Sequence, residues 1–497
     1  MKFKIDFEPT GNFWVDNGKV QLKRLLGLED GQEVELQEVV DKLVREYLVK
    51  PTGNRGKFYN PLTGQLETYE KMNWIDPANV FIKITPQTKE TKTKSGKTPK
   101  YTCMVNGKKK EVPQFEFPPR YRIEIRLTKK KALCAFCGNS ANLADLKQYL
   151  YPFLVGLDKF SNFYPSMKTP YKSCPMCTLA GVAAWLSTFY KIHRDNLHMF
   201  LFHSDDLGFL SRFLDSLRPI IASEELKDSK TNFPAEFSGE YLHETMLGFL
   251  FYLFSKLYEQ ETNAQIDELL SPFLRGGKSR RANLILVGIS GQRTNGGFHM
   301  TGFTEFSKLE PLYELYKSWR NNKVDPSQIV REFKKKEGKS WNTIWRERVA
   351  IGITDFSEIA QPIEDFIYNA RVKEDNPYPI KNLSQFLGTY HQEVLKMDED
   401  TIKLLAGFGH SLGEKCREED EMGLLYSLRN AKNIDDYLRT LNDIQFRLEM
   451  TVPEALTRVE KGERIAGQPW QRIKTLLSIY AMNAFLWRGP EKKEESR

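Results

Sequence analysis

Hydrophobic and polar positions follow two different periods along this chain. A period of two is typical of strands, and apolar spacings of three and four are typical of amphipathic helices. Alternation predicts a hairpin around residues 12–20 and strands at 3–8, 79–85, 120–127, 196–203, 281–290 and 298–301. Helical spacing predicts helices at 34–50, 178–190, 207–222, 240–270, 309–320, 326–336, 341–350, 381–396, 424–431, 434–448, 452–462 and 469–488. The strand signals fade after about residue 309.

This order of elements predicts an α+β fold, with a mixed N-terminal domain followed by a C-terminal helical bundle. We place the mixed domain at residues 1–340, the bundle at 341–488 and a charged tail at 489–497. A content of 40% hydrophobic and 28% charged residues is ordinary for a soluble globular protein. The most apolar run, Met246–Leu257, is shorter than the roughly 20 residues that span a bilayer, so we expect no membrane contact.

Four of the six cysteines form two Cys-x-x-Cys pairs. Each pair can bind one side of a tetrahedral ion, so the sequence predicts a zinc site with the ligands Cys134, Cys137, Cys174 and Cys177. Four thiolates close the coordination shell, which predicts a structural zinc ion with no catalytic function. Thiols used as metal ligands indicate a reducing compartment, so we expect a cytoplasmic protein. We expect no function for Cys103 and Cys416.

Two enzyme classes lack the residues that they require. A zinc-bound HNH nuclease needs a histidine base near the cysteine pairs, and no histidine lies between Cys137 and Cys174. Gly-Lys-Ser/Thr triplets begin at Gly96, Gly277 and Gly338, but the glycine of a phosphate-binding loop is missing five positions earlier in each case.

Two alternatives to a binding function stay open. Asp205 and Asp206 follow a predicted strand, where nuclease carboxylates often lie, and His203 is close in sequence. A zinc-stabilised, metal-dependent nuclease could use these three residues. A zinc-containing scaffold that binds only proteins is the other alternative.

Basic residues gather in four segments, although the net charge of the whole chain is only +8. The segments are a lysine-rich loop at 89–110, residues 276–281, a glycine-rich turn at 291–297 and residues 331–348. Lysine and arginine bind phosphates without reading sequence, glycine turns let a backbone approach base edges, and tryptophan stacks on bases. We therefore predict nucleic-acid contacts at Lys94, Lys97, Lys100, Lys278, Arg280, Arg281, Gln292, Arg293, Asn295, Lys334, Lys335, Lys336, Trp341 and Trp345.

Several of these motifs together resemble one known family. The chain is similar to the zinc-finger-bearing large subunit of type I CRISPR Cascade complexes, of the I-A/I-B branch. The resemblance covers nearly the whole chain in order and size. It rests on Cys134-Ala-Phe-Cys137-Gly, Phe160-Ser-Asn-Phe-Tyr164, Cys174-Pro-Met-Cys177-Thr-Leu-Ala-Gly, and, in the helical C-terminal third, Leu428-Arg-Asn-Ala-Lys-Asn433 and Asp436-Tyr-Leu.

The resemblance implies a binding function and no catalysis. It implies that the chain belongs to an RNA-guided surveillance complex, contacts the crRNA, and recognises the short motif that flanks a DNA target. It also implies that the chain helps to open double-stranded DNA and steadies the displaced single strand. The implied protein partners are the Cascade backbone and small subunits and a recruited helicase–nuclease.

Overall fold

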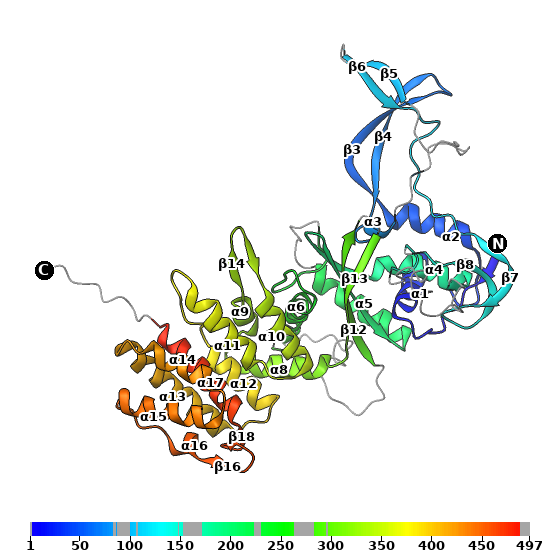
Figure 1. Cartoon of the computed structure of the whole chain (residues 1–497). Coiled ribbons are helices and arrows are strands. Elements are labelled where there is room, and N and C mark those ends of the chain that lie inside the picture. The colour runs from blue at the N-terminus through cyan, green and yellow to red at the C-terminus, as the bar shows by residue number, and fades with distance from the viewer. Residues whose placement is uncertain are drawn as a thin grey trace, which may run out of the picture. The chain divides into compact units, whose positions relative to one another are not determined.

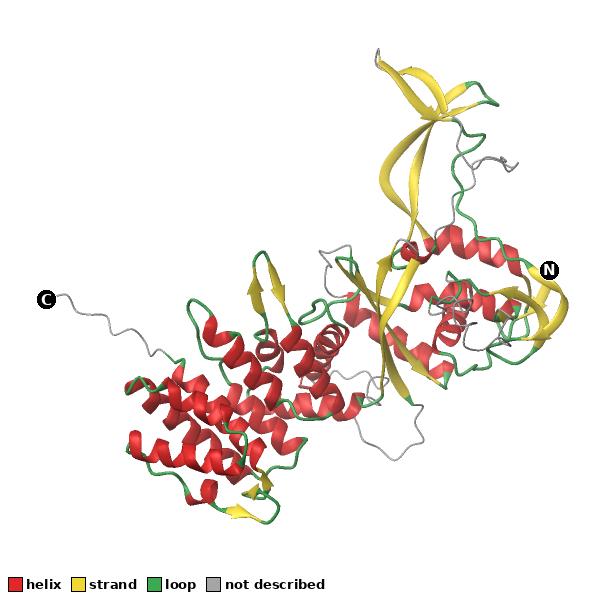
Figure 2. Cartoon of the chain, viewed as in Figure 1, coloured by secondary structure: helices red, strands yellow, loops and turns green. Residues whose placement is uncertain are grey.

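The computed structural model describes residues 2–82, 86, 100–105, 108–147, 149–152, 171–222, 230–262, 283–294 and 297–487. The chain divides into two compact units, Met1–Phe233 with Lys278–Ser307 and Pro234–Gly277 with Lys308–Arg497. Strands gather in the first unit and helices in the second, which confirms the predicted α+β class (Figure 2). This division differs from the predicted boundary at residue 340, because helix α6 (Leu242–Thr262) packs with helices that follow residue 308.

The core of the first unit is a four-stranded antiparallel sheet with helices packed against it. The strand order is β10 (Phe189–His193), β11 (Asn196–Ser204), β12 (Leu284–Thr294) and β13 (Gly297–Phe306). The following helices complete this core: α1 (Phe13–Leu26), α4 (Pro175–Ala183), the 3-10 helix η3 (Ala184–Ser187) and α5 (Leu207–Ala222).

The hairpin predicted around residues 12–20 is wrong, because this segment begins helix α1. The Asn12 side chain accepts hydrogen bonds from the Trp14 and Val15 amides and caps the helix. A Cβ on Gly18 would lie 1.8 Å from the Ala180 carbonyl oxygen, so α1 and α4 touch at this glycine. The alternation of the sequence was too short to distinguish a strand from a capped helix.

Two further strand predictions are wrong for the described residues. Residues 79–81 belong to helix α3 (Ala78–Phe81), and the Phe81 ring packs against Trp185 and Phe298 at 4.9 and 4.7 Å. Residues 121–126 form no strand. The Gln37 side chain donates to the Ile123 carbonyl and accepts from the Ile125 amide, in the place of a neighbouring strand.

The rest of the first unit consists of short elements and a two-hairpin arm. The short elements are β1 (Lys2–Lys4), β2 (Glu33–Glu35), α2 (Leu36–Leu43), the π-helix η1 (Val44–Leu48), β7 (Leu127–Leu133), β8 (Ser140–Asp145) and β9 (Lys172–Ser173). The arm comprises β3 (Val49–Asn60), β4 (Gln65–Trp74), β5 (Lys100–Val105) and β6 (Lys108–Pro113) (Figure 1). Residues 100–105 and 108–113 therefore form strands, whereas the sequence predicted a loop there.

A small aromatic core joins the two hairpins of the arm. Phe58 is fully buried and packs against Tyr69 and Phe115, at 5.7 and 5.5 Å between ring centres. Tyr59 of β3 stacks on Tyr101 of β5 at 3.7 Å, with the ring planes 8° apart.

The second unit is built from helices around a long apolar helix, α17 (Trp470–Phe485), which packs on α13 (Glu399–Glu418). A small hairpin and a small three-stranded sheet interrupt the helices. In chain order the elements are α6, α8 (Leu309–Asn321), α9 (Pro326–Arg331), β14 (Lys335–Glu337), β15 (Ser340–Asn342), α10 (Ile344–Asp355), α11 (Ala360–Asn369), the 3-10 helix η4 (Arg371–Lys373), α12 (Leu383–Glu393), α13, α14 (Met422–Asn430), α15 (Ile434–Arg447), α16 (Glu454–Thr457), β16 (Val459–Glu460), β17 (Arg464–Ile465), β18 (Gln468–Pro469) and α17.

Three helix predictions in this unit need correction. The helix predicted at 326–336 ends at Arg331, and the one predicted at 341–350 begins at Ile344, because β14 and β15 form a hairpin between them. Gly338 at the tip of this hairpin has φ +59°, a conformation that suits a tight turn. The helix predicted at 452–462 is only the short α16. No helix in the described ranges is long and apolar enough to cross a membrane.

Candidate metal centre and basic groove

The four predicted metal ligands come together in the first unit. Cys134 and Cys137 lie in the turn between β7 and β8, Cys174 caps the N-terminus of α4, and Cys177 lies in the first turn of that helix. Their four sulfur atoms all lie within 4.8 Å of one another, and none forms a disulfide. Cys137 is partly exposed and the other three are buried. This group can hold a metal ion.

Backbone amides point at the sulfur atoms. The Cys174 amide donates to the Cys134 sulfur at 3.3 Å, and the Cys177 amide donates to the Cys174 sulfur at 3.4 Å. Gly138 has φ +71°, and its amide donates to the Cys134 carbonyl, which closes the turn that carries the first pair. Hydrogen bonds from the Cys174 and Cys177 thiols lower the pKa of Cys134, and the same contacts raise the pKa of the two donating thiols. The two backbone amide donors favour thiolates, the form in which cysteine binds metals.

The nucleic-acid residues predicted before position 331 fall into two groups, those outside the described residues and those on strands of the first unit. Lys94, Lys97, Lys278, Arg280, Arg281 and Asn295 lie outside the described residues. Lys100 is exposed on β5 and forms an ion pair with Glu111 at 2.7 Å. Gln292 and Arg293 lie in β12, opposite Asn196 of β11 and Phe298 of β13 respectively.

The glycine-rich segment that begins at Gly291 is a strand up to Thr294, whereas the sequence predicted a turn. A Cβ on Gly291 would lie 2.0 Å from the Phe298 ring, so this glycine makes room for an aromatic side chain. The glycine therefore serves packing within the sheet at this position.

The predicted residues of the 331–348 segment do converge, on a groove in the second unit. Lys334, Lys335, Lys336 and Trp341 line a cavity of about 480 Å³. Trp341 is 52% exposed and stands opposite Lys336 across the hairpin. The Lys334 ammonium group lies 4.6 Å from the centre of its ring. Trp345 does not line the groove, and its ring packs against Phe366 at 5.8 Å.

A second segment, residues 371–378, also lines the groove, and the sequence did not predict it as functional. Its lining residues are Arg371, Lys373, Glu374, Asp375 and Tyr378. Their only signal in the sequence was a run of charged residues, which is ordinary for a solvated surface. Because these residues lie far from Lys334 along the chain, the sequence did not indicate that the two segments line the same groove.

A buried arginine neutralises two of the three acidic side chains of the groove. Arg371, whose side chain is 3% exposed, forms ion pairs with Glu332 at 2.7 Å and Glu374 at 3.0 Å. Within the described part of the chain, no ion pair or hydrogen bond engages Lys335, Lys336, Lys373 or Asp375 through its side chain. The groove therefore presents the ammonium groups of these three lysines and of Lys334, which lies over the Trp341 ring, together with the free carboxylate of Asp375.

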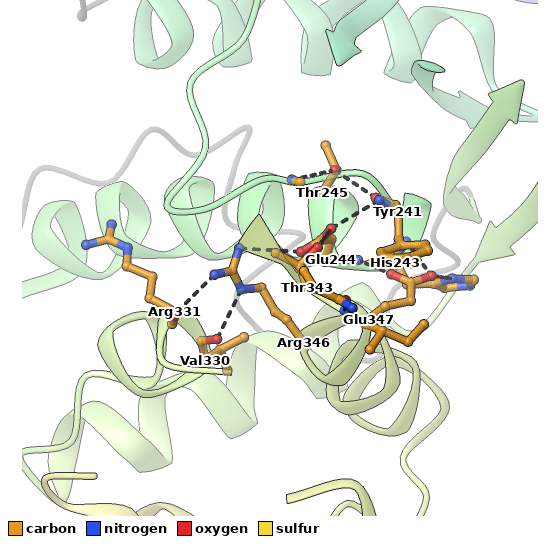
Figure 3. Close-up of polar contacts among 12 residues, drawn as sticks. Tyr241, His243, Glu244, Thr245, Val330, Arg331, Thr343, Arg346 and Glu347 are labelled. Atoms are coloured by element: carbon orange, nitrogen blue, oxygen red, sulfur yellow. Dashed lines mark hydrogen bonds and ion pairs between the residues drawn. The ribbon is translucent and has the colours of Figure 1, made fainter. Parts of the chain in front are cut away.

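A buried polar network holds the chain that leads into the groove (Figure 3). Arg346 of α10 donates to the carbonyls of Val330 and Arg331 at 3.3 and 2.9 Å, and its guanidinium lies 3.4 Å from a carboxylate oxygen of Glu244. The Thr343 hydroxyl donates to the same Glu244 carboxylate at 2.6 Å. Burial raises the pKa of Glu244 to about 7, although Thr343 and Arg346 oppose that effect.

The same network caps helix α6. Glu347 accepts hydrogen bonds from the backbone amides of His243 and Glu244 at the N-terminus of α6, at 3.2 and 2.7 Å. One of its oxygens also lies 2.8 Å from the Nδ1 atom of His243. The carboxylate thus satisfies helix amides that would otherwise be unpaired.

The residues of the nuclease alternative do not form a metal cluster. Asp206 accepts from the Phe209 amide at 2.8 Å and caps helix α5. His203 is buried, which lowers its pKa. Among the described residues, the four cysteines are the only group of three or more side chains suited to hold a metal ion.

The two other cysteines occupy ordinary positions. Cys416 is fully buried in α13, and this burial raises its pKa to about 12. The Cys103 sulfur lies 3.5 Å from the Lys110 carbonyl oxygen within the arm.

No protein-family model and no curated protein matches this chain.

Proposed function

We propose that this protein is a non-catalytic, nucleic-acid-binding large subunit of an RNA-guided surveillance complex. The observation that carries the proposal is the groove between Lys334–Lys336 and Lys373. Ammonium groups without carboxylate partners attract phosphates, and the exposed ring of Trp341 offers a surface on which a base can stack. The resemblance of the cysteine motifs to those of the large subunit of Cascade supports the assignment to an RNA-guided surveillance complex.

We further propose that the metal at the four cysteines is zinc. Four thiolates suit this ion, and a closed shell leaves no position for water or substrate. The ion would join the β7–β8 turn to the start of α4, and so fix the ends of the chain between the two cysteine pairs. In this assignment the metal stabilises the fold and the groove contacts the nucleic acid.

The proposed partners follow from this assignment. The groove would hold the displaced single strand, and the arm strands, which carry Lys100, Lys109 and Lys110, would contact duplex phosphates. The guide RNA, the other Cascade subunits and the recruited helicase–nuclease would complete the assembly.

The decisive experiment is purification together with coexpressed partner subunits, followed by sequencing of the bound RNA. We expect short, repeat-derived guide RNAs. The isolated chain should bind a labelled single strand, with an affinity that falls as salt rises and a log–log slope of about −2 for three phosphate contacts. Magnesium-dependent cleavage by the isolated chain, or absence of RNA with all partners present, would overturn the proposal.

A further inference from the structure

Beyond general attraction of phosphates, the groove has the features of a pocket for one nucleotide. Its volume of about 480 Å³ lies within the range of roughly 300–1,000 Å³ that is usual for small-ligand sites. Two aromatic side chains line it, Trp341 at 52% and Tyr378 at 48% exposure. Exposed rings beside unpaired cations match the two parts of a nucleotide, a flat base and a phosphate.

Tyr378 is held in place before any ligand arrives. The Arg371 guanidinium lies 4.0 Å from the centre of its ring, and its hydroxyl donates to Glu332 at 2.8 Å. Arg371 is in turn fixed by Glu332 and by Glu374. A ring that is already immobile loses little conformational entropy when a base stacks on it.

Trp341 is also positioned by its neighbours. It lies in the middle of β15, directly opposite Lys336, and Lys334 covers part of its ring. The hairpin is closed by Gly338 and by a hydrogen bond of 3.1 Å from Asn342 to Glu337. The two rings thus stand on separate, locally fixed elements that line one cavity.

Asp375 is the one carboxylate of the groove that is not bonded to Arg371. A carboxylate accepts hydrogen bonds from amino groups of bases, as it does from the N4 amino group of cytosine. Thymine and uracil have no such amino group. The side chain therefore offers a means of distinguishing bases, in a groove where every other charged group without a partner is a cation.

We propose that this groove binds a single unstacked nucleotide, with its base against Trp341 and Tyr378, its phosphate on Lys335, Lys336 and Lys373, and an amino-bearing base favoured by Asp375. This inference rests on the proposed function, since it specifies what the nucleic-acid groove recognises. The nucleotide can belong to a single strand or be free, and the chemistry of recognition is the same.

The test compares two oligonucleotides by fluorescence anisotropy with the full chain. One is a labelled hexamer of deoxycytidine, and the other has the same backbone without bases. We expect the abasic strand to bind about 10-fold more weakly, and Trp341→Ala to abolish that difference. Trp487→Ala, which removes another exposed tryptophan of the second unit, should leave the difference intact. Tyr378→Phe keeps the ring and should retain most of the affinity.

Two further measurements determine whether the nucleotide is free or part of a strand, and whether Asp375 selects the base. Competition by cytidine monophosphate at millimolar concentration would identify a free-nucleotide site, and competition only by oligonucleotides would identify a strand site. Wild-type protein should prefer the cytidine hexamer to a thymidine hexamer about 5-fold, and Asp375→Asn should remove this preference.

The outcomes distinguish failure of the inference from failure of the proposed function. Equal affinity for the abasic and cytidine strands would overturn the nucleotide pocket while nucleic-acid binding stood. An equal affinity for cytidine and thymidine strands would overturn the assignment of Asp375. No binding of any strand would overturn both proposals.

Discussion

The guanidinium of Arg371 lies 4.0 Å from the centre of the Tyr378 ring, and both side chains bind the same carboxylate, Glu332. Arg371 is buried, whereas Tyr378 is half exposed. A charge inside the unit thus fixes an aromatic ring on its surface. The contact connects the stability of the helical unit with the shape of the groove.

Replacing Arg371 should therefore destabilise the protein. Arg371→Met removes the cation that neutralises Glu332 and Glu374, and leaves both carboxylates partly buried without it. Because these carboxylates keep some access to water, we expect a loss of about 2 kcal/mol in the free energy of unfolding, below the range for a fully buried pair. Urea unfolding of the variant and the wild-type protein measures this change in the free energy of unfolding. Arg320→Met, at a more exposed ion pair, is the control and should cost less than 1 kcal/mol. Equal losses of stability for Arg371→Met and Arg320→Met would contradict a stabilising function of the Arg371 ion pairs.

The buried carboxylate of Glu244 should make stability depend on pH. Its pKa rises from 4.5 to about 7 on folding, so the folded chain holds a proton that the unfolded chain releases. The resulting stabilisation is complete below pH 4.5 and is lost as the pH rises to 7, by about 3 kcal/mol. Glu244→Gln should remove this part of the pH dependence. Parallel pH profiles of unfolding for the two proteins would show that Glu244 does not titrate in this way.

Loss of one cysteine should release the proposed zinc. Cys177→Ser removes one ligand of the four, so we expect much less than one zinc per chain by elemental analysis and a lower melting temperature. Acid should also release the metal, because thiolates must be deprotonated to bind it. Cys103→Ser, which changes a cysteine of strand β5 outside the four-sulfur cluster, is the matched control and should keep full metal content. A Cys177→Ser protein with unchanged metal content would refute the four-cysteine site.

Two glycines of helix α13 should respond in opposite directions to the same substitution. A Cβ on Gly413 would lie 2.0 Å from the Ala481 carbonyl oxygen of α17, whereas a Cβ on Gly407 would meet nothing within 4 Å. Gly413→Ala must push the two helices apart, and we expect a loss of about 2 kcal/mol or more. Gly407→Ala should raise stability by about 0.5–1 kcal/mol, because alanine favours the helix. Thermal unfolding of both variants checks the contact, and similar melting temperatures would argue against it.

Local patterns in the sequence predicted the features that depend on local chemistry. Two Cys-x-x-Cys pairs predict a metal site because each pair can reach one ion within a single turn, and all four sulfur atoms do converge. Long apolar periods predicted α5, α8, α15 and α17 with bounds close to those observed. Such periods are reliable because a long amphipathic helix has one way to bury its face.

Short patterns were ambiguous, and only tertiary contacts decided them. The first residues of α1 alternate like a strand, yet Asn12 caps a helix whose Gly18 packs against α4. Lys334–Lys336 continue the period of α9, yet a turn at Gly338 makes them part of a hairpin. In each case the intrinsic preference of the short segment for helix or strand is weak, and packing against a distant segment outweighs that preference.

The sequence by itself determined the α+β class, the cysteine site and the basic character of residues 331–348. Only the tertiary structure placed Lys373 and Tyr378 beside Trp341, and only it showed that Arg371 neutralises the glutamates of the groove. The physical reason is that a groove is a property of two chain segments about 30 residues apart, whose approach is set by the packing of the helices between them. No spacing along the chain encodes that approach.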